Sequence, residues 1–325
     1  MKFSVVIAVY NKAPYVKTTL ESVLAQTLAD FEVIVVDDGS NDGSGDIVAA
    51  IPDPRVHLVR QANAGVSVAR NRGIGLAKGE WVACLDADDW LHPRYLATQW
   101  ATVIAHPQVD VVATQFRRSL SAESWRPEPW RLPDSPPRVE VIRDLAARWK
   151  HGGLFFTSSI AVRTSVLRSL PTLFPAGESY GEDLDLWFRL NECSPIALAH
   201  VQLVTYRTRL PGSLAGSQAA SSSEQPFLLR LERRALDGSM PEGLRASTLR
   251  LVNEHRIRLA RRAIENSRRS DAPRLLWRAR SSLYSPQWWL TALMVILAPA
   301  GLVKRWQGWR SGRTPSNEGG SIRGR

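Results

Sequence analysis

The first ninety residues alternate between short apolar runs and segments in which apolar side chains recur at helical spacing. Segments with helical spacing, such as 15–26 and 65–77, lie between apolar runs of strand length. The run at 32–36 is almost continuously apolar, which is typical of strands covered on both faces in parallel sheets. This alternation predicts an α/β fold with an open, mostly parallel, doubly wound sheet. The expected strands are residues 3–10, 32–36, 56–59 and 81–85.

Beyond residue 90 the same pattern continues less regularly, and then the composition changes. Further strands are expected at 109–113, 158–162 and 196–206, and further helices at 93–106, 141–149 and 184–191. The predicted organisation is one large domain over 1–215, a Ser- and Gly-containing linker over 216–225, a basic helical region over 226–306 and a disordered tail over 307–325.

Three carboxylates follow the apolar run that ends at Leu85, namely Asp86, Asp88 and Asp89. Repulsion and loss of hydration both oppose such a cluster at the end of a buried strand, so it needs a compensating positive charge. A divalent cation with oxygen ligands, carrying a phosphorylated substrate, fits this need. The alternative is a simple helix N-terminus with acidic residues ahead of Pro93.

The predicted topology brings other polar residues to the same edge of the sheet. Ligands of open α/β sheets bind outside the carboxyl ends of the strands. The first, second and fourth strands end at Tyr10, at Asp37-Asp38 and at Asp86. Side chains that are far apart in the sequence are therefore expected to meet at one rim, which favours a metal or nucleotide site.

The net charge of +11 is placed unevenly along the 325 residues. Residues 1–225 hold 22 Lys and Arg against 24 Asp and Glu, whereas residues 226–325 hold 20 against 7. The nearly neutral first part shows no footprint of nucleic-acid binding, and the basic second part suits an anionic membrane surface. The two cysteines show no zinc-binding spacing, and a reducing cytosol suits them.

An uncharged apolar segment, 288–303, lies within the basic region. Its length of about 16 residues is short of the ~20 needed to span a bilayer, and Pro299 interrupts it. The segment begins with Trp288 and Trp289, and Lys304 and Arg305 follow it directly. Aromatic and basic residues at the ends of an apolar segment are typical of a membrane interface. We expect in-plane or re-entrant membrane contact, and a location peripheral to the inner face of the cytoplasmic membrane; a buried helix of a helical subdomain is the alternative.

Four short motifs follow one another along the first part of the chain: Ser4–Asn11, Val35–Ser40, Asp86–Asp89 and Gly181–Asp183. In this order and spacing they resemble the inverting family 2 glycosyltransferases of the bacterial surface-glycan type, over about residues 3–215. The resemblance implies a GT-A fold, a Rossmann-like sheet flanked by helices, here with a C-terminal helical appendage. It also implies transfer of a sugar from a nucleotide-activated donor with inversion. The Gln-x-x-Arg-Trp motif of processive synthases is absent, so one sugar per encounter is expected.

The resemblance also implies roles for residues around the nucleotide. Ala8 and Tyr10 would line the base and ribose, and Asp38 would accept a hydrogen bond from the base, which favours a UDP-sugar. Asp86 would meet the ribose or a metal-bound water. Apart from the resemblance, the position of Arg70 on the helix after Gly65 would let it reach the donor phosphates; a solvated helix face is the alternative for this residue.

Metal binding and base catalysis are assigned by the same resemblance. Asp88, with Asp86, would hold Mg²⁺ or Mn²⁺ bridging the diphosphate. Asp183 would be the general base, kept ionised by the helix dipole and therefore a weak base; helix capping is the alternative for this residue. Arg209 stands where many members carry a His, so it would contact the diphosphate and leaves the third metal ligand unassigned.

Two other functional classes compete with this interpretation. A haloacid-dehalogenase-like phosphatase also has Asp-x-Asp after a strand, but there the motif normally opens the fold. A non-catalytic sugar-nucleotide-binding subunit of a glycan assembly complex is the second alternative, and the presence of both Asp88 and Asp183 argues against it. The expected acceptor is a glycan or a lipid-linked molecule, recognised through residues 117–153 and the basic helices that follow residue 225.

Overall fold

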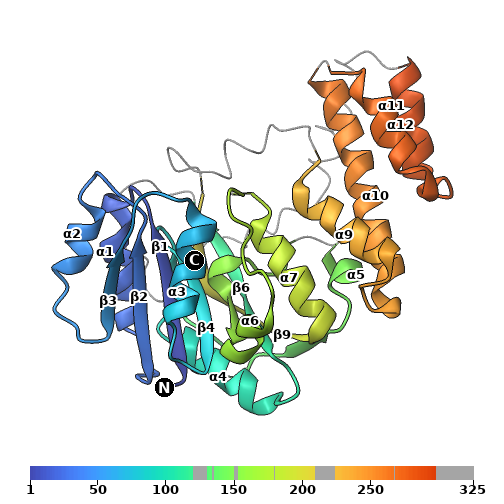
Figure 1. Ribbon diagram of the computed structural model, residues 1–325. Coiled ribbons are helices and arrows are strands. Elements are labelled where there is room, and N and C mark those ends of the chain that lie inside the picture. The colour runs from blue at the N-terminus through green and yellow to red at the C-terminus, as the bar shows by residue number, and fades with distance from the viewer. Residues whose placement is uncertain are drawn as a thin grey trace, which may run out of the picture. The chain divides into compact units, whose positions relative to one another are not determined.

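The computed structural model describes residues 1–119, 130–133, 135–149, 153–178, 180–208, 224–266 and 268–297 (Figure 1). Its described residues form two compact units. The first holds residues 1–208 and 225–244, and the second holds Glu224 and residues 245–297. The predicted tail, 307–325, and the predicted linker except for Glu224 and Gln225 lie outside the described residues.

A nine-stranded sheet forms the centre of the first unit, in the order β3-β2-β1-β4-β8-β6-β9-β5, with β7 pairing to β9. The strands β3, β2, β1 and β4 are parallel, as the βαβ pattern predicts. The other half is mixed, because β8 runs antiparallel to both β4 and β6, whereas β6 and β9 are parallel. The strands are β1 Phe3–Val9, β2 Phe31–Asp37, β3 Val56–Arg60, β4 Trp81–Asp86, β5 Trp90–Leu91, β6 Val111–Ser119, β7 Val139–Ile142, β8 Ile160–Arg163 and β9 Ile196–Arg207.

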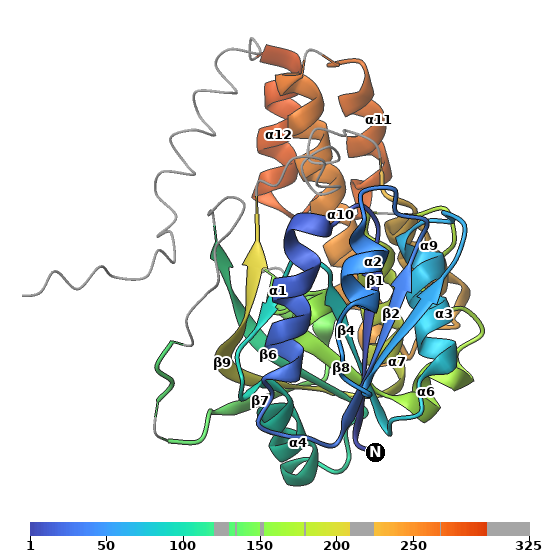
Figure 2. The ribbon, with the colours of Figure 1, turned by 90° about the vertical axis from the view of Figure 1, so that its left-hand side faces the viewer.

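Helices cover both faces of this sheet (Figure 2). Alternate side chains of β1, β2 and β4 pack against α1, α2 and α4 in one hydrophobic core. Residues of opposite parity, such as Val6 and Val82, face α3, α6 and α7. Two-sided burial explains why these strands read as continuous apolar runs. The helices of this unit are α1 Ala13–Leu24, α2 Ser44–Ala49, α3 Val66–Leu76, α4 Tyr95–Ala105, α5 Leu145–Trp149, α6 Thr164–Ser169, α7 Glu182–Cys193 and α9 Pro226–Asp237, with a 3₁₀ turn, η1, at Thr157–Ser159.

The expected α/β fold is confirmed, and the differences are local. Residues 141–142, expected to begin the helix 141–149, instead end β7, which runs from Val139 to Ile142 along β9, so α5 begins only at Leu145. The helix α9, expected in the basic helical region that starts at 226, packs on α7 in the first unit. The Phe227 ring lies against Gly181 at the start of α7, which explains this packing.

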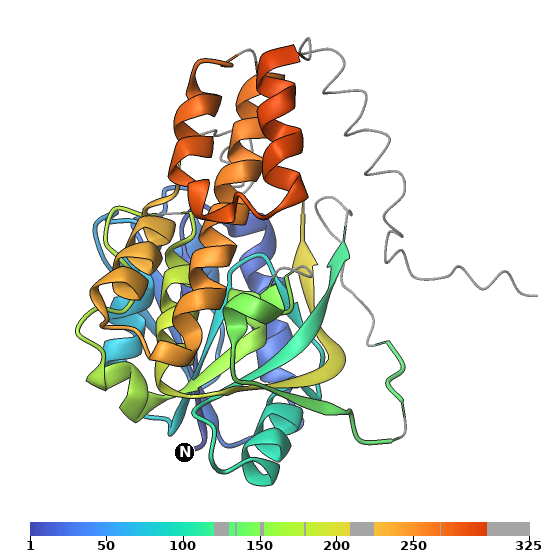
Figure 3. The same ribbon diagram turned by 90° about the vertical axis from the view of Figure 1, so that its right-hand side faces the viewer.

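The second unit consists of three helices side by side (Figure 3). Its core contains Ile257 and Ile264 of α10 and Leu276 of α11, against which Trp288 and Val295 of α12 pack. Among the described residues, no helix combines the length and the apolar character required to cross a membrane. The elements are α10 Glu242–Glu265, α11 Asp271–Arg278, the 3₁₀ turn η2 Arg280–Ser282 and α12 Pro286–Leu297.

Two glycines next to β1 provide a test of this packing. A Cβ at Gly79 would lie 2.5 Å from backbone atoms of Phe3 and Ser4, whereas a Cβ at Gly75 in α3 would meet nothing within 4 Å. We expect Gly79→Ala to lower the free energy of unfolding by about 2 kcal/mol or more, because the backbone must move. Gly75→Ala should leave it unchanged or raise it by up to about 1 kcal/mol through helix propensity. Urea unfolding of the full chain measures both, and equal stability of the two variants would contradict this packing of β1.

Candidate functional site

The carboxyl ends of β1, β2 and β4 lie at one rim, as the sequence predicts. The strand register places Ala8 beside Asp86 and Val9 beside Asp37. The backbone N–H of Asp38 donates to the carbonyl oxygen of Val9 at 2.8 Å, which joins the second strand end to the first. The acidic residues after β2 and β4 therefore share one edge of the sheet.

Arg70, on α3, joins this rim to the start of α7. Its Nη2 donates to Asp86 Oδ1 at 2.7 Å and its Nη1 to Glu182 Oε1 at 2.9 Å. The side chain is buried, and its guanidinium also lies 5.3 Å from the centre of the Phe174 ring. Arg70 thus holds two carboxylates rather than facing the solvent, so the structure makes it a positioning residue and gives no support to the predicted contact with donor phosphates.

Lys12, directly before α1, supplies the second positive charge. Its Nζ lies 2.5 Å from Asp88 Oδ2, and both side chains are largely covered. Burial raises the pKa of Asp88, and the Lys12 charge opposes that shift. Within the described residues, no group of three or more His, Cys, Asp or Glu side chains is arranged to hold a metal by itself.

Asp89 is the most buried carboxylate of this cluster. Ser158 Oγ donates to its Oδ2 at 2.6 Å, and the backbone N–H of Arg207 donates to its Oδ1 at 3.1 Å. Burial, followed by the charges of Asp88 and Asp86, raises the pKa of Asp89 well above its ordinary value. The same acids and burial raise the pKa of Tyr206 to about 12. Asp89 therefore fixes β9 and η1 to the end of β4.

Asp183 lies in the first turn of α7. Thr157 Oγ1 donates to its Oδ2 at 3.0 Å, and the backbone N–H of Leu184 donates to its Oδ1 at 2.7 Å. Burial raises the pKa of Asp183 and the Arg70 charge opposes the shift, whereas the sequence predicts that the helix dipole favours the ionised form. The Asp86 charge adds to the increase. Asp183 directly follows Glu182, which Arg70 links to Asp86 at the rim.

The Asp38 carboxylate stabilises the loop that leads into α3. Its Oδ1 accepts from the Ala64 backbone at 2.9 Å and from Gln61 Nε2 at 2.6 Å, and its Oδ2 accepts from the Gly65 backbone at 2.8 Å. Both oxygens therefore have partners in the chain, and the assigned contact with a base remains a prediction. Tyr10 is 49% exposed at the rim, which leaves its ring accessible.

Sequence reasoning missed four residues of this site: Lys12, Ser158, Glu182 as a partner of Arg70, and Arg207. Only Lys12 carried a signal, because it follows the first strand where the rim was expected. Ser158 and Arg207 reach the rim through β8 and β9, whose neighbours in the sheet are distant in sequence. Arg209, predicted to contact the diphosphate, lies outside the described residues.

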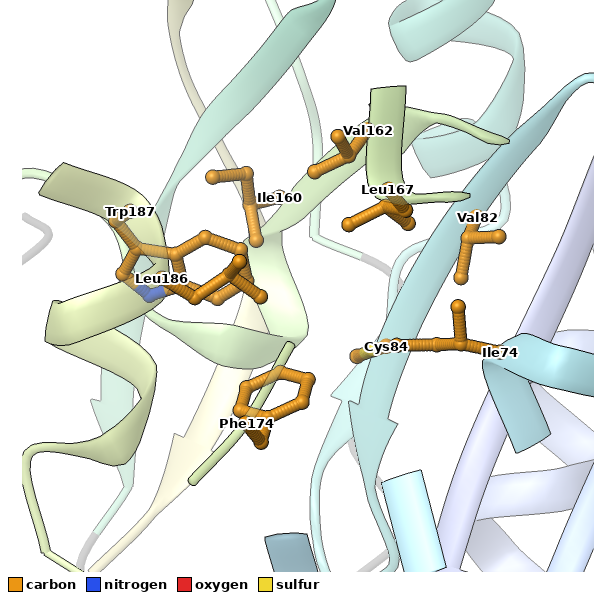
Figure 4. A pocket seen from close by; sticks show the side chains of 9 residues that line it. All are labelled: Ile74, Val82, Cys84, Ile160, Val162, Leu167, Phe174, Leu186 and Trp187. Atoms are coloured by element: carbon orange, nitrogen blue, oxygen red, sulfur yellow. The ribbon is translucent and has the colours of Figure 1, made fainter. Parts of the chain in front are cut away.

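An apolar pocket lies behind the rim, between the sheet and the helices α3, α6 and α7 (Figure 4). Cys84 of β4 faces this pocket, and burial raises the pKa of its thiol to about 12. The lining carries no carboxylate, so the pocket belongs to the core and not to the polar site. Its lining residues are Ile74, Val82, Cys84, Ile160, Val162, Leu167, Phe174, Leu186 and Trp187.

Comparisons with known proteins agree with this geometry. The sequence pattern that defines "Glycosyl transferase family 2" matches residues 4–168. The succinoglycan biosynthesis protein ExoO of Rhizobium meliloti is 44% identical over 119 residues, which are 34% of this chain and 34% of ExoO. Glycosyltransferase GlyA of Streptococcus pneumoniae is 35% identical over 117 residues, which are 35% of this chain and 17% of GlyA. The matches thus span about a third or less of these relatives.

A solved structure shares the fold. The crystal structure of S. aureus TarS 1–349 in complex with UDP-GlcNAc superposes with a TM-score of 0.60 at 19% identity, and the alignment covers 96% of this chain and 92% of that one. The complex of the same protein with UDP gives a TM-score of 0.62 at 18% identity, over 95% of this chain and 92% of that one.

The pKa of Glu182 provides a test of the buried acidic cluster. Burial, followed by the charge of Asp183, raises the pKa of Glu182 from 4.5 to about 7. Because the folded state holds this proton more tightly, its contribution to stability is complete below pH 4.5 and is lost as the pH rises through about 7. Glu182→Gln should show a shallower fall in the free energy of unfolding over that range, by on the order of 1–2 kcal/mol.

The matched control is Glu80→Gln, because the Glu80 side chain is exposed and forms a surface ion pair with Arg163. This variant should keep the pH dependence of the parent protein, measured by urea unfolding at pH 4.5 to 8. An unchanged slope in Glu182→Gln would contradict the raised pKa of Glu182.

Proposed function

The chain belongs to glycosyl transferase family 2, and from that premise we propose that it transfers a single sugar, with inversion, from a UDP-sugar to an acceptor hydroxyl. The observation that carries the proposal is the pair of ion pairs by which Arg70 joins Asp86, at the end of β4, to Glu182, at the start of α7. Asp88 lies two residues after Asp86, and Asp183 directly follows Glu182. In the proposal, Asp86 and Asp88 form the acidic group on the phosphate side and Asp183 is a separate carboxylate base.

The donor nucleotide is assigned to the ends of β1 and β2. Ala8 is half-buried at the rim and Tyr10 is exposed there, so a backbone edge and a ring are available to a base and ribose. Asp38 carries the predicted contact with the base, in addition to the loop that it holds. The UDP and UDP-GlcNAc complexes of TarS, a protein with the same fold, support the choice of a uridine nucleotide.

The residues at the end of β4 fit a divalent cation of the Mg²⁺ or Mn²⁺ type. Mg²⁺ is usually bound by one or two carboxylates together with substrate phosphates, so a cage of three protein ligands is not required. Asp88 would be the protein ligand, with Asp86 in reach of a metal-bound water. When bound, such a cation would neutralise the charge that develops on the leaving diphosphate.

Lys12 has a role of its own in this proposal. Its ammonium group pairs with Asp88, and Lys12 lies at the rim between β1 and α1. A lysine is a compact charge on a flexible stem, so it can turn from the carboxylate to a phosphate oxygen. We assign Lys12 to the donor diphosphate in place of Arg70.

Asp183 is the proposed general base. The acceptor oxygen forms a bond to the anomeric carbon, the bond from that carbon to the diphosphate breaks, and the electron pair leaves with the diphosphate. The proton of the acceptor hydroxyl goes to Asp183. Burial makes this carboxylate more basic than an exposed Asp, and Thr157 and the Leu184 N–H orient it, which suits base catalysis.

The biological role proposed is cell-surface polysaccharide or glycolipid assembly, with a glycan or lipid-linked acceptor. The similarity to ExoO, a succinoglycan biosynthesis protein, supports this role. A panel of sugar nucleotides, assayed for release of the nucleoside diphosphate, would identify the donor. Binding of UDP with no turnover of any donor would favour the non-catalytic alternative.

Asp183→Asn tests the assignment of the base. The amide cannot accept the proton, so turnover of the donor should fall at least about a hundredfold, while the affinity for UDP stays within about threefold. Titration calorimetry with UDP and a diphosphate-release assay measure the two effects. Asp46→Asn, at an exposed position on α2, is the matched control and should retain both. Normal turnover by Asp183→Asn would remove Asp183 from the mechanism.

Asp88→Ala and Lys12→Met test the diphosphate subsite by binding alone. In Asp88→Ala the gain in UDP affinity on adding Mn²⁺ should shrink by about tenfold or more. In Lys12→Met the affinity for UDP without Mn²⁺ should fall by about tenfold, because a charge-assisted contact to phosphate is lost. Calorimetry with UDP, with and without Mn²⁺, measures both. An undiminished Mn²⁺ effect in Asp88→Ala would show that the cation binds elsewhere.

A further inference from the structure

Exposed apolar side chains are concentrated in the second unit. Of the fourteen large hydrophobic residues that are exposed in the described part of the chain, eight lie between residues 277 and 297. Such a concentration of exposed apolar side chains within about twenty residues is typical of an interaction site, whereas apolar residues scattered singly over a surface are normal. We call these eight residues the apolar surface: Trp277, Leu283, Tyr284, Trp289, Leu290, Leu293, Ile296 and Leu297.

The helix α12 carries most of this surface on one side. Its inner side, including Trp288, Ala292 and Val295, packs against the core formed by α10 and α11. Its outer side exposes Leu293 and Ile296 at helical spacing, the latter to 74%. The twelve residues of α12 contain no charged side chain, so the outer side is apolar without the polar face of an ordinary surface helix.

Two arginines hold α12 in this orientation. Arg261 donates to Thr291 Oγ1 at 2.7 Å and to the Gln287 carbonyl at 3.0 Å. Arg269 donates to the Val295 carbonyl at 2.6 Å and thereby satisfies the C-terminal end of the helix. The outer side is therefore presented by a fixed helix, and its exposure is not the result of a loose segment.

The charge next to this surface indicates what covers it. Residues 245–297 contain eleven Arg and three acidic residues. Arg280 lies beside the apolar surface, with its guanidinium 5.1 Å from the centre of the Trp277 ring, and Arg274 is exposed one turn before Trp277 on α11. Apolar side chains flanked by arginine and by Trp and Tyr suit the boundary between acyl chains and anionic headgroups.

We propose that the apolar surface docks this chain onto an anionic lipid bilayer, with α12 lying in the plane of the membrane interface. The in-plane orientation follows from the two sides of α12, because the inner side is packed on protein and only the outer side is available to lipid. The proposal does not depend on the glycosyl-transfer chemistry, since none of its residues belongs to the acidic rim.

Co-flotation of the full chain with vesicles tests the proposal. The chain should bind vesicles of phosphatidylcholine and phosphatidylglycerol (7:3) and bind pure phosphatidylcholine more weakly. The double variant Leu293→Glu/Ile296→Glu should lose at least about tenfold in partitioning, because each glutamate removes an apolar side chain from lipid and adds a like charge to the headgroups. Both positions are exposed, so unfolding should be unaffected, which thermal melting checks.

The matched control is Leu236→Glu, because Leu236 on α9 is 69% exposed but lies outside the apolar surface. It should partition like the parent chain. Equal partitioning of the double variant and the parent would overturn the proposal, as would failure of the parent chain to bind either vesicle. A parent chain that is dimeric by light scattering, and becomes monomeric in the double variant without any vesicle binding, would identify a second copy as the occupant and also overturn it.

Discussion

The structure of the first unit depends on the neutralisation, by basic side chains, of the carboxylates that gather at the end of β4. Arg70 is shared between Asp86 and Glu182, and Lys12 pairs with Asp88. An unpaired buried charge would cost several kcal/mol, so each pair requires the segments that bring it together. The pairs therefore connect the loop before α1, the helix α3, the strand β4 and the helix α7 at one rim.

The basic side chains do not neutralise all the carboxylates of the rim. The remaining negative charge is the feature that connects the rim to catalysis. Five carboxylates, Asp86, Asp88, Asp89, Glu182 and Asp183, lie near three side-chain cations: Arg70 and Lys12 form ion pairs, and Arg207 Nε donates to the Asp88 carbonyl oxygen at 3.0 Å. Burial first, and the neighbouring acids in addition, raise the pKa values of Asp88, Asp89 and Asp183. A rim with surplus negative charge favours a ligand that arrives with a cation, which is the reason why a donor carrying Mg²⁺ or Mn²⁺ is a consistent proposal.

The sequence predicted the parallel half of the sheet well, because strands buried on both faces leave long apolar runs. It failed where the structure depends on distant partners. The strand β7 has only four residues and is defined by its pairing with β9, and β5 has two. The predicted topology placed the acids at one rim, but it did not identify the side chains that pair with them. The ion pairs of Arg70 with Asp86 and Glu182 cannot be inferred from the residue spacing of α3, and the burial that raises the pKa of Asp183 cannot be inferred from its place in the first turn of α7.

The arginines of the second unit show why net charge alone is a poor guide to a partner. Arg256 and Arg278 pair with Glu224, and Arg261 and Arg269 bind polar groups of α12. Part of the positive charge is thus used to stabilise the unit, whereas six of its eleven arginines are exposed: Arg250, Arg258, Arg262, Arg268, Arg274 and Arg280. Attraction to an anionic bilayer contributes about 1 kcal/mol for each basic residue that lies near the headgroups, and burying several side chains of α12 contributes more than any one of them. Membrane binding by this unit should accordingly depend more on the apolar surface than on salt.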